Sequence, residues 1–250
     1  MTLSGHARIF RLGTLIGFLP LLILVWGCGN PIDHKVSDRI AGILPKTLGP
    51  AKSYDVKTTG TSLHLTSGHI GRVTIHGEDV LLAPGLTVDT FDADVQDIAL
   101  DTRSQRVTGM SPIQFTVGIS AAHLNSYLAS TAASSPSRPQ NLAVTLSGQT
   151  LAINFTVRPL LVNVPVSVVG ALAPQAGKST ELNFVPTGAH VSIVPVPSGL
   201  VNLALSHVNP VVDLGSMRFP LAIDRCWVQS GNLCLSGTAT IPPSSFSHPS

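Results

Sequence analysis

The sequence predicts a single β-rich α+β domain, with a long, curved antiparallel sheet and two or three short helices. Hydrophobic residues make up 44% of the 250 residues but aromatic residues only 5%, so the apolar side chains are mostly aliphatic. Apolar and polar residues alternate in many runs that are separated by turns containing glycine or proline, the pattern of half-buried strands. Over 86–100 this alternation slips twice, which indicates bulges that bend a long strand.

The composition excludes several classes of protein. Charged residues make up 11% of the chain, where about 25% is usual for a soluble domain, and such an apolar chain does not stay disordered. The sequence has no sustained heptad pattern of a coiled coil. A formal net charge of +2 gives no support for a nucleic-acid partner.

The first 27 residues have the pattern of an export signal. Arg8 and Arg11 precede an uncharged apolar run over 12–26, which is shorter than the roughly 20 apolar residues of a membrane-spanning helix. The run leads into Val25-Trp26-Gly27-Cys28, which resembles a bacterial lipobox. Three outcomes stay open: lipidation of Cys28, an uncleaved anchor, and plain secretion. Each places the rest of the chain outside the cytoplasm, and the expected location is the cell envelope, on the periplasmic side of the cytoplasmic membrane, with a lipid anchor.

The rest of the chain is expected to form one domain over 28–241, followed by a loose tail over 242–250. Loss of Arg8 and Arg11 with the signal leaves 13 basic residues, equal to the 13 acidic ones, so the domain is neutral. The stretch 73–101 contains seven acidic residues and no Lys or Arg. A solvated strand face is the first explanation for these acids, and a cation site is the second.

Two helices can be placed from their caps. The first is short and amphipathic, capped by Asp33 and ended by Pro45, and its apolar face consists of Val36, Ile40, Ile43 and Leu44. The second follows Ser120, which is a suitable N-cap, and Ile119 and Leu124 occupy the positions of a hydrophobic staple. The apolar stripe of this second helix consists of Leu124, Tyr127 and Leu128.

Strands account for most of the remaining sequence. They are expected throughout 54–118 and again at 142–146, 151–157 and 160–168. Pro165 indicates an edge strand or a bulge. Helical spacing returns over 200–208, before two final strands.

The two final strands form a hairpin that contains Cys226 and Cys234. A three-residue loop over 229–231 would pair position 226 with position 234 and bring the two thiols within disulfide reach. An oxidising compartment would then close the bond. A metal site is the alternative, but it is disfavoured because no histidine lies nearby.

Several stretches together resemble the LmeA-like phospholipid-binding family of bacterial envelope proteins. They are LPKTLGPAKSYDV at 44–56, VTIHGEDV at 73–80, PGLTVD at 84–89, VNPVVDL at 208–214, FPL at 219–221 and GNLCLSG at 231–237. Their order and spacing carry the resemblance, which covers about residues 32–241.

The resemblance implies a binder of anionic phospholipids that is linked, in some members, to assembly of envelope glycolipids. It also implies a tubular, BPI-like architecture, in which a curved antiparallel sheet wraps one or two helices and leaves an apolar tunnel. No lipid-contact residue is carried over, because the family has no short site motif to match. The cysteine pair departs from the common pattern of the family.

The physics of the predicted elements allows this function. Two helices of about eleven residues are each only ~16 Å long, so they leave part of an aliphatic sheet face for acyl chains. Burying a 16-carbon chain contributes on the order of 12 kcal/mol, which a bilayer also supplies, so the protein suits a lipid carrier or holder. The residues expected to line the lipid site are Val36, Ile40, Ile43, Leu44, Leu124, Tyr127 and Leu128.

A positive region near the first helix is the candidate headgroup site. Residues 28–72 contain six basic and three acidic residues. The candidates for phosphate contact are Lys46, Lys52, Lys57 and Arg72. Ordinary solvated surface side chains are the alternative explanation.

Other chemistry finds little support in the sequence. Gly177-Lys178-Ser179 ends like a phosphate-binding loop, but position 172, where its first glycine belongs, is Leu. His64, His69 and His76 lack the spacing of a zinc motif, so no metal and no cofactor are expected. The sequence also has no nucleophile elbow. A phospholipid-binding protein without catalytic residues is therefore the main prediction; an accessory envelope lipoprotein that acts through protein contacts and an unrecognised hydrolase are the alternatives.

Overall fold

A computed structural model describes residues 31–59, 68–101, 106–132, 140–157, 163–190, 199, 205–206, 208–215, 217 and 220–240. Within them the chain forms two antiparallel sheets and two helices, α1 (Pro31–Thr47) and α3 (Ala121–Ala132). The strands are β1 (Ser53–Thr59), β2 (His69–Ala83), β3 (Leu86–Asp101), β4 (Arg106–Gly109), β5 (Ile113–Ser120), β6 (Gln140–Ser147), β7 (Thr150–Val157), β8 (Val164–Gln175), β9 (Lys178–His190), β10 (Val212–Asp213), β11 (Leu221–Gln229) and β12 (Asn232–Ala239).

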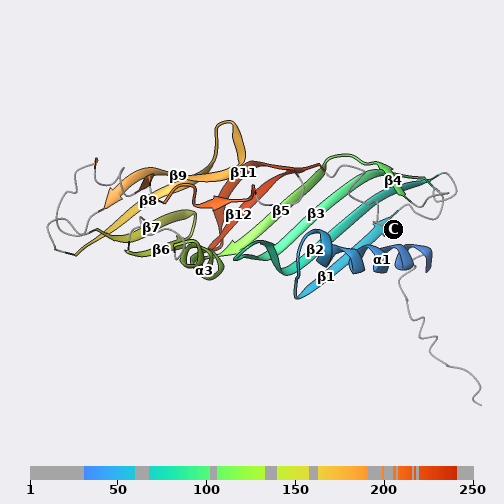
Figure 1. The fold of residues 1–250 in the computed structure, drawn as a ribbon, viewed down its shortest axis with the longest axis horizontal. Coiled ribbons are helices and arrows are strands. Elements are labelled where there is room, and N and C mark those ends of the chain that lie inside the picture. The colour runs from blue at the N-terminus through green and yellow to red at the C-terminus, as the bar shows by residue number, and fades with distance from the viewer. Residues whose placement is uncertain are drawn as a thin grey trace, which may run out of the picture.

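The two sheets meet in one elongated molecule (Figure 1). Sheet A has the strand order β1-β2-β3-β5-β12-β11, with β4 paired to β3, and sheet B has the order β10-β9-β8-β7-β6. Strand β11 packs against β8 and β9, while α3 contacts β3 and β5 of sheet A and β6 of sheet B. Helix α1 packs along β1. The β-rich α+β class and the strongly curved antiparallel sheet are thereby confirmed.

The predicted bends of the long strand lie in both β2 and β3. Buried positions in β3 change phase between Val88 and Phe91 and again between Val95 and Ile98. Strand β2 changes phase opposite both places, and one aspartate at each has a left-handed backbone: Asp79 (φ 49°) and Asp97 (φ 52°). The matched slips keep the same face buried while the strand pair bends.

Helix α1 is longer than the sequence predicted. It begins at Pro31, so Asp33 lies in the first turn and is not the N-cap. Proline is favoured at the first position of a helix, where its missing amide hydrogen costs nothing. Pro45 lies inside the last turn, and the helix continues to Thr47 because the Leu48 amide still donates to the Leu44 carbonyl at 2.8 Å.

Helix α3 begins where predicted. The His123 amide donates to Ser120 Oγ at 3.4 Å, which confirms Ser120 as the N-cap, and Leu124 is fully buried. The Asn125 side chain connects the helix to sheet B, since it donates to the Val144 carbonyl at 2.9 Å and accepts from the Val144 amide at 2.6 Å. The amide group thus replaces a neighbouring strand at the β6 edge.

The predicted register of the cysteine hairpin is wrong by one residue. The turn has two residues, Ser230 and Gly231, both with positive φ, instead of three. Cys226 therefore pairs with Leu235, and Cys234 pairs with Trp227. Since facing residues share one face of a sheet, the two thiols lie on opposite faces. Both are free, so the expected disulfide is not formed in this structure.

Two other predictions on the later strands can be compared with the structure. Strand β8 lies between β7 and β9 and is not an edge strand; among the described residues β9 pairs with β8 from Ser167 onward, so Pro165 lies outside the described β8–β9 pairing. Gly177 belongs to the tight β8–β9 turn, so the sequence that resembles a phosphate loop is a hairpin. Most of the helical segment expected over 200–208 lies outside the described residues.

Candidate functional site

One face of sheet A is almost entirely aliphatic and buried; we call it the inner face. It extends across β1, β2, β3, β5, β12 and β11, because inward positions alternate with exposed ones along each strand. Its side chains are each less than a tenth exposed. Members from all six strands are Val56, Val73, Ile75, Val80, Leu86, Val88, Phe91, Ala93, Val95, Ile98, Ile113, Phe115, Val117, Ile119, Leu221, Ile223, Leu233, Leu235 and Ala239.

Helix α1 packs on the inner side of β1. The Ser37 hydroxyl lies 3.2 Å from that of Thr58, whose side chain is buried beside Val56. Leu44 is buried and Ile40 is partly buried against the same core. Ile43 is 42% exposed, so it lies at the solvent-facing margin of the apolar stripe that contains Ile40 and Leu44, and its predicted burial on that face is wrong. The Val36 side chain lies outside the described residues.

The other three predicted lining residues all lie on α3. Leu124, Tyr127 and Leu128 are buried in the core cluster that joins both sheets. They share the apolar stripe that the sequence predicted, and this stripe closes the junction of sheet A with β6. The structure thus brings Leu44, Ile40 and these three residues to the apolar interior, at two separate places along it.

The predicted headgroup residues do not converge on one point. Lys52 pairs with Glu78 at 3.2 Å, Lys57 with Asp55 at 3.2 Å, and Arg72 with Asp94 through two hydrogen bonds of 2.7 and 2.6 Å. Lys57 and Arg72 point away from the inner face, since they occupy the exposed positions of β1 and β2. Lys46 and Lys52 lie at the end of α1 and just before β1.

These ion pairs shift the pKa values of their members in the directions that opposite charges require. The hydrogen bond and charge of Glu78 raise the pKa of Lys52, and Lys52 lowers the pKa of Glu78. The hydrogen bond from Arg72 lowers the pKa of Asp94. All four groups stay charged at neutral pH, so each basic side chain already has an anionic partner.

An open groove of about 560 Å³ crosses the other face of sheet A, which we call the outer face. Residues of β1, β2, β3, β5 and β12 line it, including the buried Ile75, Ala93 and Phe115. Most are polar or charged: Asp55, Lys57, Thr74, His76, Asp92, Asp94, Gln114, Thr116 and Ser236. His76 Nδ1 and Asp92 Oδ1 lie 2.7 Å apart here. Charged walls make this groove unsuited to acyl chains.

The remaining sequence candidates are scattered or lie outside the described residues. His69 is exposed at the start of β2, His76 is part of the outer-face pair with Asp92, and His64 and Cys28 are not among the described residues. Among the described residues, no helix is long and apolar enough to cross a membrane.

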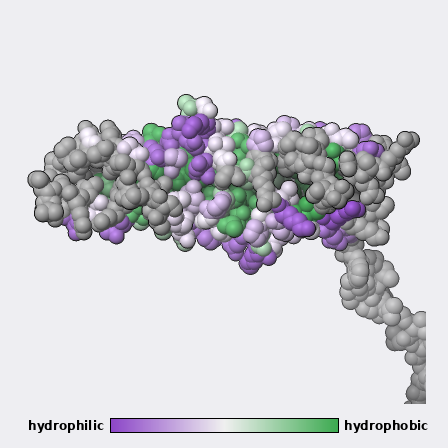
Figure 2. Space-filling model, in the orientation of Figure 1, coloured by the Kyte–Doolittle hydropathy of each residue, from purple (hydrophilic) through white to green (hydrophobic). Residues whose placement is uncertain are grey.

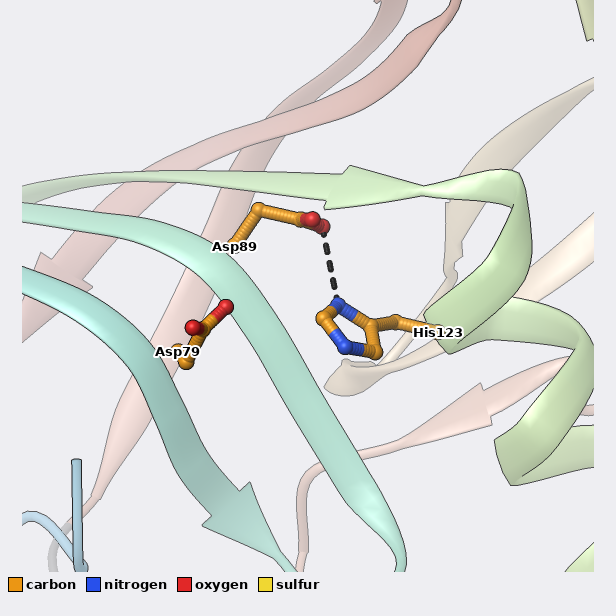
Figure 3. Close-up of side chains that lie close together, drawn as sticks. All are labelled: Asp79, Asp89 and His123. Carbon is orange, nitrogen blue, oxygen red and sulfur yellow. Dashed lines mark ion pairs between the residues drawn. The ribbon is translucent and has the colours of Figure 1, made fainter. Parts of the chain in front are cut away.

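One cluster was only partly indicated by the sequence, because Asp79 and Asp89 belong to the acidic stretch 73–101, for which a cation site was the second explanation, but His123 was not indicated. Asp79, Asp89 and His123 come together from β2, β3 and the first turn of α3 (Figure 3). Asp89 Oδ2 lies 3.1 Å from His123 Nδ1 and accepts the Ser120 amide. Burial tends to raise the pKa of Asp89, but the hydrogen bond from Ser120 and the nearby His123 imidazole together outweigh it and lower that pKa.

Comparison with known proteins agrees with this architecture. A model of the LmeA-like phospholipid-binding family matches residues 30–238, which include all described strands except the last residue of β12. No curated protein and no solved structure matches the chain. The match covers far more than half of the sequence and includes the whole inner face except Ala239. The chain therefore belongs to the LmeA-like phospholipid-binding family.

Proposed function

We propose that this protein binds a phospholipid by holding its acyl chains within the apolar interior between the inner face of sheet A and helices α1 and α3. The continuity of the aliphatic inner face over six strands is the observation that carries the proposal. Such a surface shields acyl chains from water at about 0.8 kcal/mol for each methylene. Because a bilayer stabilises the chains equally well, loading from a membrane is near balance and fits a carrier or holder.

The entrance to this interior is proposed to lie beside α1. On this helix, Leu44 is buried and Ile40 is partly buried against the core. Figure 2 shows hydrophobic residues reaching the surface between hydrophilic ones, most clearly near the middle of the molecule. Displacing α1 from β1 would uncover Thr58 and Val56, the first inward residues of sheet A. The contact between the Ser37 and Thr58 hydroxyls separates more readily than a contact between apolar core side chains would, because water can replace the hydrogen bond.

The phosphate is proposed to contact Lys46 and Lys52, which favours anionic lipids. Both lie where α1 leads into β1, next to the proposed entrance. A phosphate oxygen can share Lys52 with Glu78, because the Lys52 side chain is 67% exposed. Lys57 and Arg72, on the outer face, serve as comparison residues with the same charge.

The protein is proposed to act in the cell envelope, attached to the periplasmic side of the membrane by lipid on Cys28. Cys28 precedes the first residue of α1 by only three positions. An anchor there would hold α1 and the proposed entrance close to the donor leaflet and raise the local concentration of lipid. A role in assembly of envelope glycolipids would follow from delivery of lipid at this surface.

Lipid occupancy tests the proposal. The full chain is purified in a mild detergent, and mass spectrometry identifies the lipids that stay bound after gel filtration. Delipidated protein is then mixed with vesicles of phosphatidylglycerol or of phosphatidylcholine and separated from them. We expect about one phospholipid per chain and a preference for phosphatidylglycerol. Failure to recover any lipid would contradict the proposal and would favour an accessory lipoprotein that acts through protein contacts.

Two pairs of variants locate the site. Ile40→Gln and Ile43→Gln change the same residue type on the same helix, but only Ile40 packs against the core. We expect Ile40→Gln to lower lipid uptake severalfold and Ile43→Gln to leave it nearly unchanged.

The headgroup site is tested by two double variants. Lys46→Gln with Lys52→Gln should reduce the preference for the anionic lipid, while Lys57→Gln with Arg72→Gln should not. Melting curves of the lipid-free variants show whether each one folds.

A further inference from the structure

Three metal-ligating side chains converge at the junction of sheet A and α3. Asp79 lies at one slip of β2, Asp89 lies opposite that slip on β3, and His123 is in the first turn of α3. One ligand atom from each lies within 4.8 Å of the other two. Figure 3 shows both carboxylates and the imidazole ring directed toward a common space.

The imidazole nitrogen in this cluster lacks a hydrogen bond. His123 Nδ1 is buried from solvent, and no group in the described part of the chain has hydrogen-bonding alignment with it. Asp89 Oδ2 is only 3.1 Å away, but its direction from the ring does not satisfy that alignment. A buried nitrogen lone pair beside two carboxylates is unfavourable, unless a cation or a proton lies between them.

The distances suit a small metal ion. Ligand atoms bound at about 2.0–2.1 Å around a tetrahedral zinc ion lie about 3.3 Å from one another. The 3.1 Å between Asp89 and His123 is close to this ligand–ligand distance. Asp79 is exposed, so its carboxylate can move closer to complete the set.

We propose that Asp79, Asp89 and His123 form a binding site for a divalent transition-metal ion of the zinc type. One imidazole and two carboxylates suit zinc or manganese better than calcium or magnesium, which favour all-oxygen sites. A bound ion would join the bent β2–β3 pair to α3, and through Asn125 and Val144 to sheet B. This site does not depend on the proposed lipid function, because its residues are polar and belong to neither the inner face nor the predicted headgroup set.

Metal titration of the full chain tests the site. The protein carries a tag without histidine, is treated with EDTA and is dialysed before zinc chloride is added in a calorimeter. We expect one zinc ion per chain and a rise in melting temperature with zinc. Cobalt chloride should give the visible absorption bands of a four-coordinate ion. No uptake at one equivalent, or tighter binding of calcium than of zinc, would overturn the proposal.

Matched variants distinguish this site from surface binding. Asp79→Asn and His123→Gln should each weaken zinc binding at least tenfold. Asp79 is exposed, so Asp79→Asn tests a ligand with little risk to folding. His76→Gln is the control, because His76 also pairs with an aspartate on β3 but belongs to no three-residue cluster among the described residues. Equal weakening by His76→Gln, or unchanged binding in Asp79→Asn, would overturn the proposal.

Discussion

The inner and outer faces of sheet A are made by alternate residues of the same strands, yet they differ in kind. Around the middle of β3, Phe91 and Ala93 are buried on the inner face, while Asp92 and Asp94 face outward. Outward side chains form ion pairs with neighbouring strands, such as Arg72 with Asp94. The inner face gains stability from excluding water, whereas exposed ion pairs contribute little to it. The proposed lipid site can therefore use one face of the sheet while the charged side chains of the other face contact water.

The slips in β2 and β3 maintain this difference over a long strand pair. Buried positions of β3 are even-numbered at Leu86 and Val88, odd-numbered at Phe91 and Val95, and even-numbered again at Ile98. Without each slip, the next segment would turn its apolar residues outward. The aspartates at the slips thus allow one continuous inner face on a bent sheet.

The largest expected effect comes from truncating an inner-face residue. Leu235→Ala removes a side chain that is 1% exposed and should lower the free energy of unfolding by about 2–5 kcal/mol. Urea denaturation followed by circular dichroism measures the change. The adjacent outer-face substitution Ser236→Ala is the control and should stay within about 0.5 kcal/mol. Equal losses at both positions would mean that the two faces are not distinct.

A glycine on the inner face tests how closely that face is packed. A Cβ atom added at Gly237 would collide with the Ala222 carbonyl and lie 2.9 Å from the Phe115 ring. Gly237→Ala should therefore destabilise the protein by about 1–3 kcal/mol. Gly109→Ala on β4 is the control, because its added Cβ would meet only Ala99, at 3.9 Å. Thermal unfolding of both variants measures the difference. A Gly237→Ala protein as stable as wild type would show that the inner face has unfilled space beside residue 237.

Local patterns allowed the sequence to predict the faces and bends of β3, but not its longer-range pairings. Alternation and its two slips are properties of neighbouring residues, and so are the Ser120 cap and the stripe of α3. The register of the cysteine hairpin depends on whether its turn has two or three residues, a difference that inverts which side chains share a face. The sequence contains Gln229-Ser230-Gly231, which suits either length.

The candidate sites depend even more on tertiary pairing. His123 is 34 residues from Asp89 in the sequence, and only packing of α3 against β3 brings them together. The predicted burial of Ile43 failed for a local reason. Ile40 and Leu44 face the core, and residue 43 lies beside them on the helix, at the margin of the apolar stripe. The pairing of Lys52 with Glu78 and of Arg72 with Asp94 likewise required the strand register, whereas Lys57 pairs with Asp55 on the same strand.

The reactivity of the two cysteines can be used to compare the two faces of sheet A, because one thiol lies on each face. Cys226 lies on the inner side of β11, and burial raises its pKa to about 12, with a smaller effect of Cys234. Burial raises the pKa of Cys234 less strongly, and this thiol faces outward. Because the thiolate is the reactive form, maleimide at pH 8 should label Cys234 at least tenfold faster than Cys226. Peptide mass spectrometry measures both rates, and a bridged peptide 2 mass units lighter would contradict the free thiols.

The smallest expected effect concerns the outer-face pair of Arg72 and Asp94. Arg72 lowers the pKa of Asp94 in the folded protein, so the pair adds stability at neutral pH that is lost as the pH falls through this lowered pKa. Arg72→Gln should return the pKa of Asp94 toward its ordinary value of about 3.9, as NMR titration of the carboxyl carbon can measure. Lys52→Gln is the control: Lys52 pairs with Glu78, so this substitution should leave the pKa of Asp94 unchanged.

The stability of the same variants gives a second readout. The difference in stability between wild type and Arg72→Gln should vanish in acid, where Asp94 is protonated in both proteins, and should shrink in high salt. A difference that persists in acid would mean that the Arg72 stem stabilises the outer face by packing, and that charge is not what distinguishes this face from the inner one.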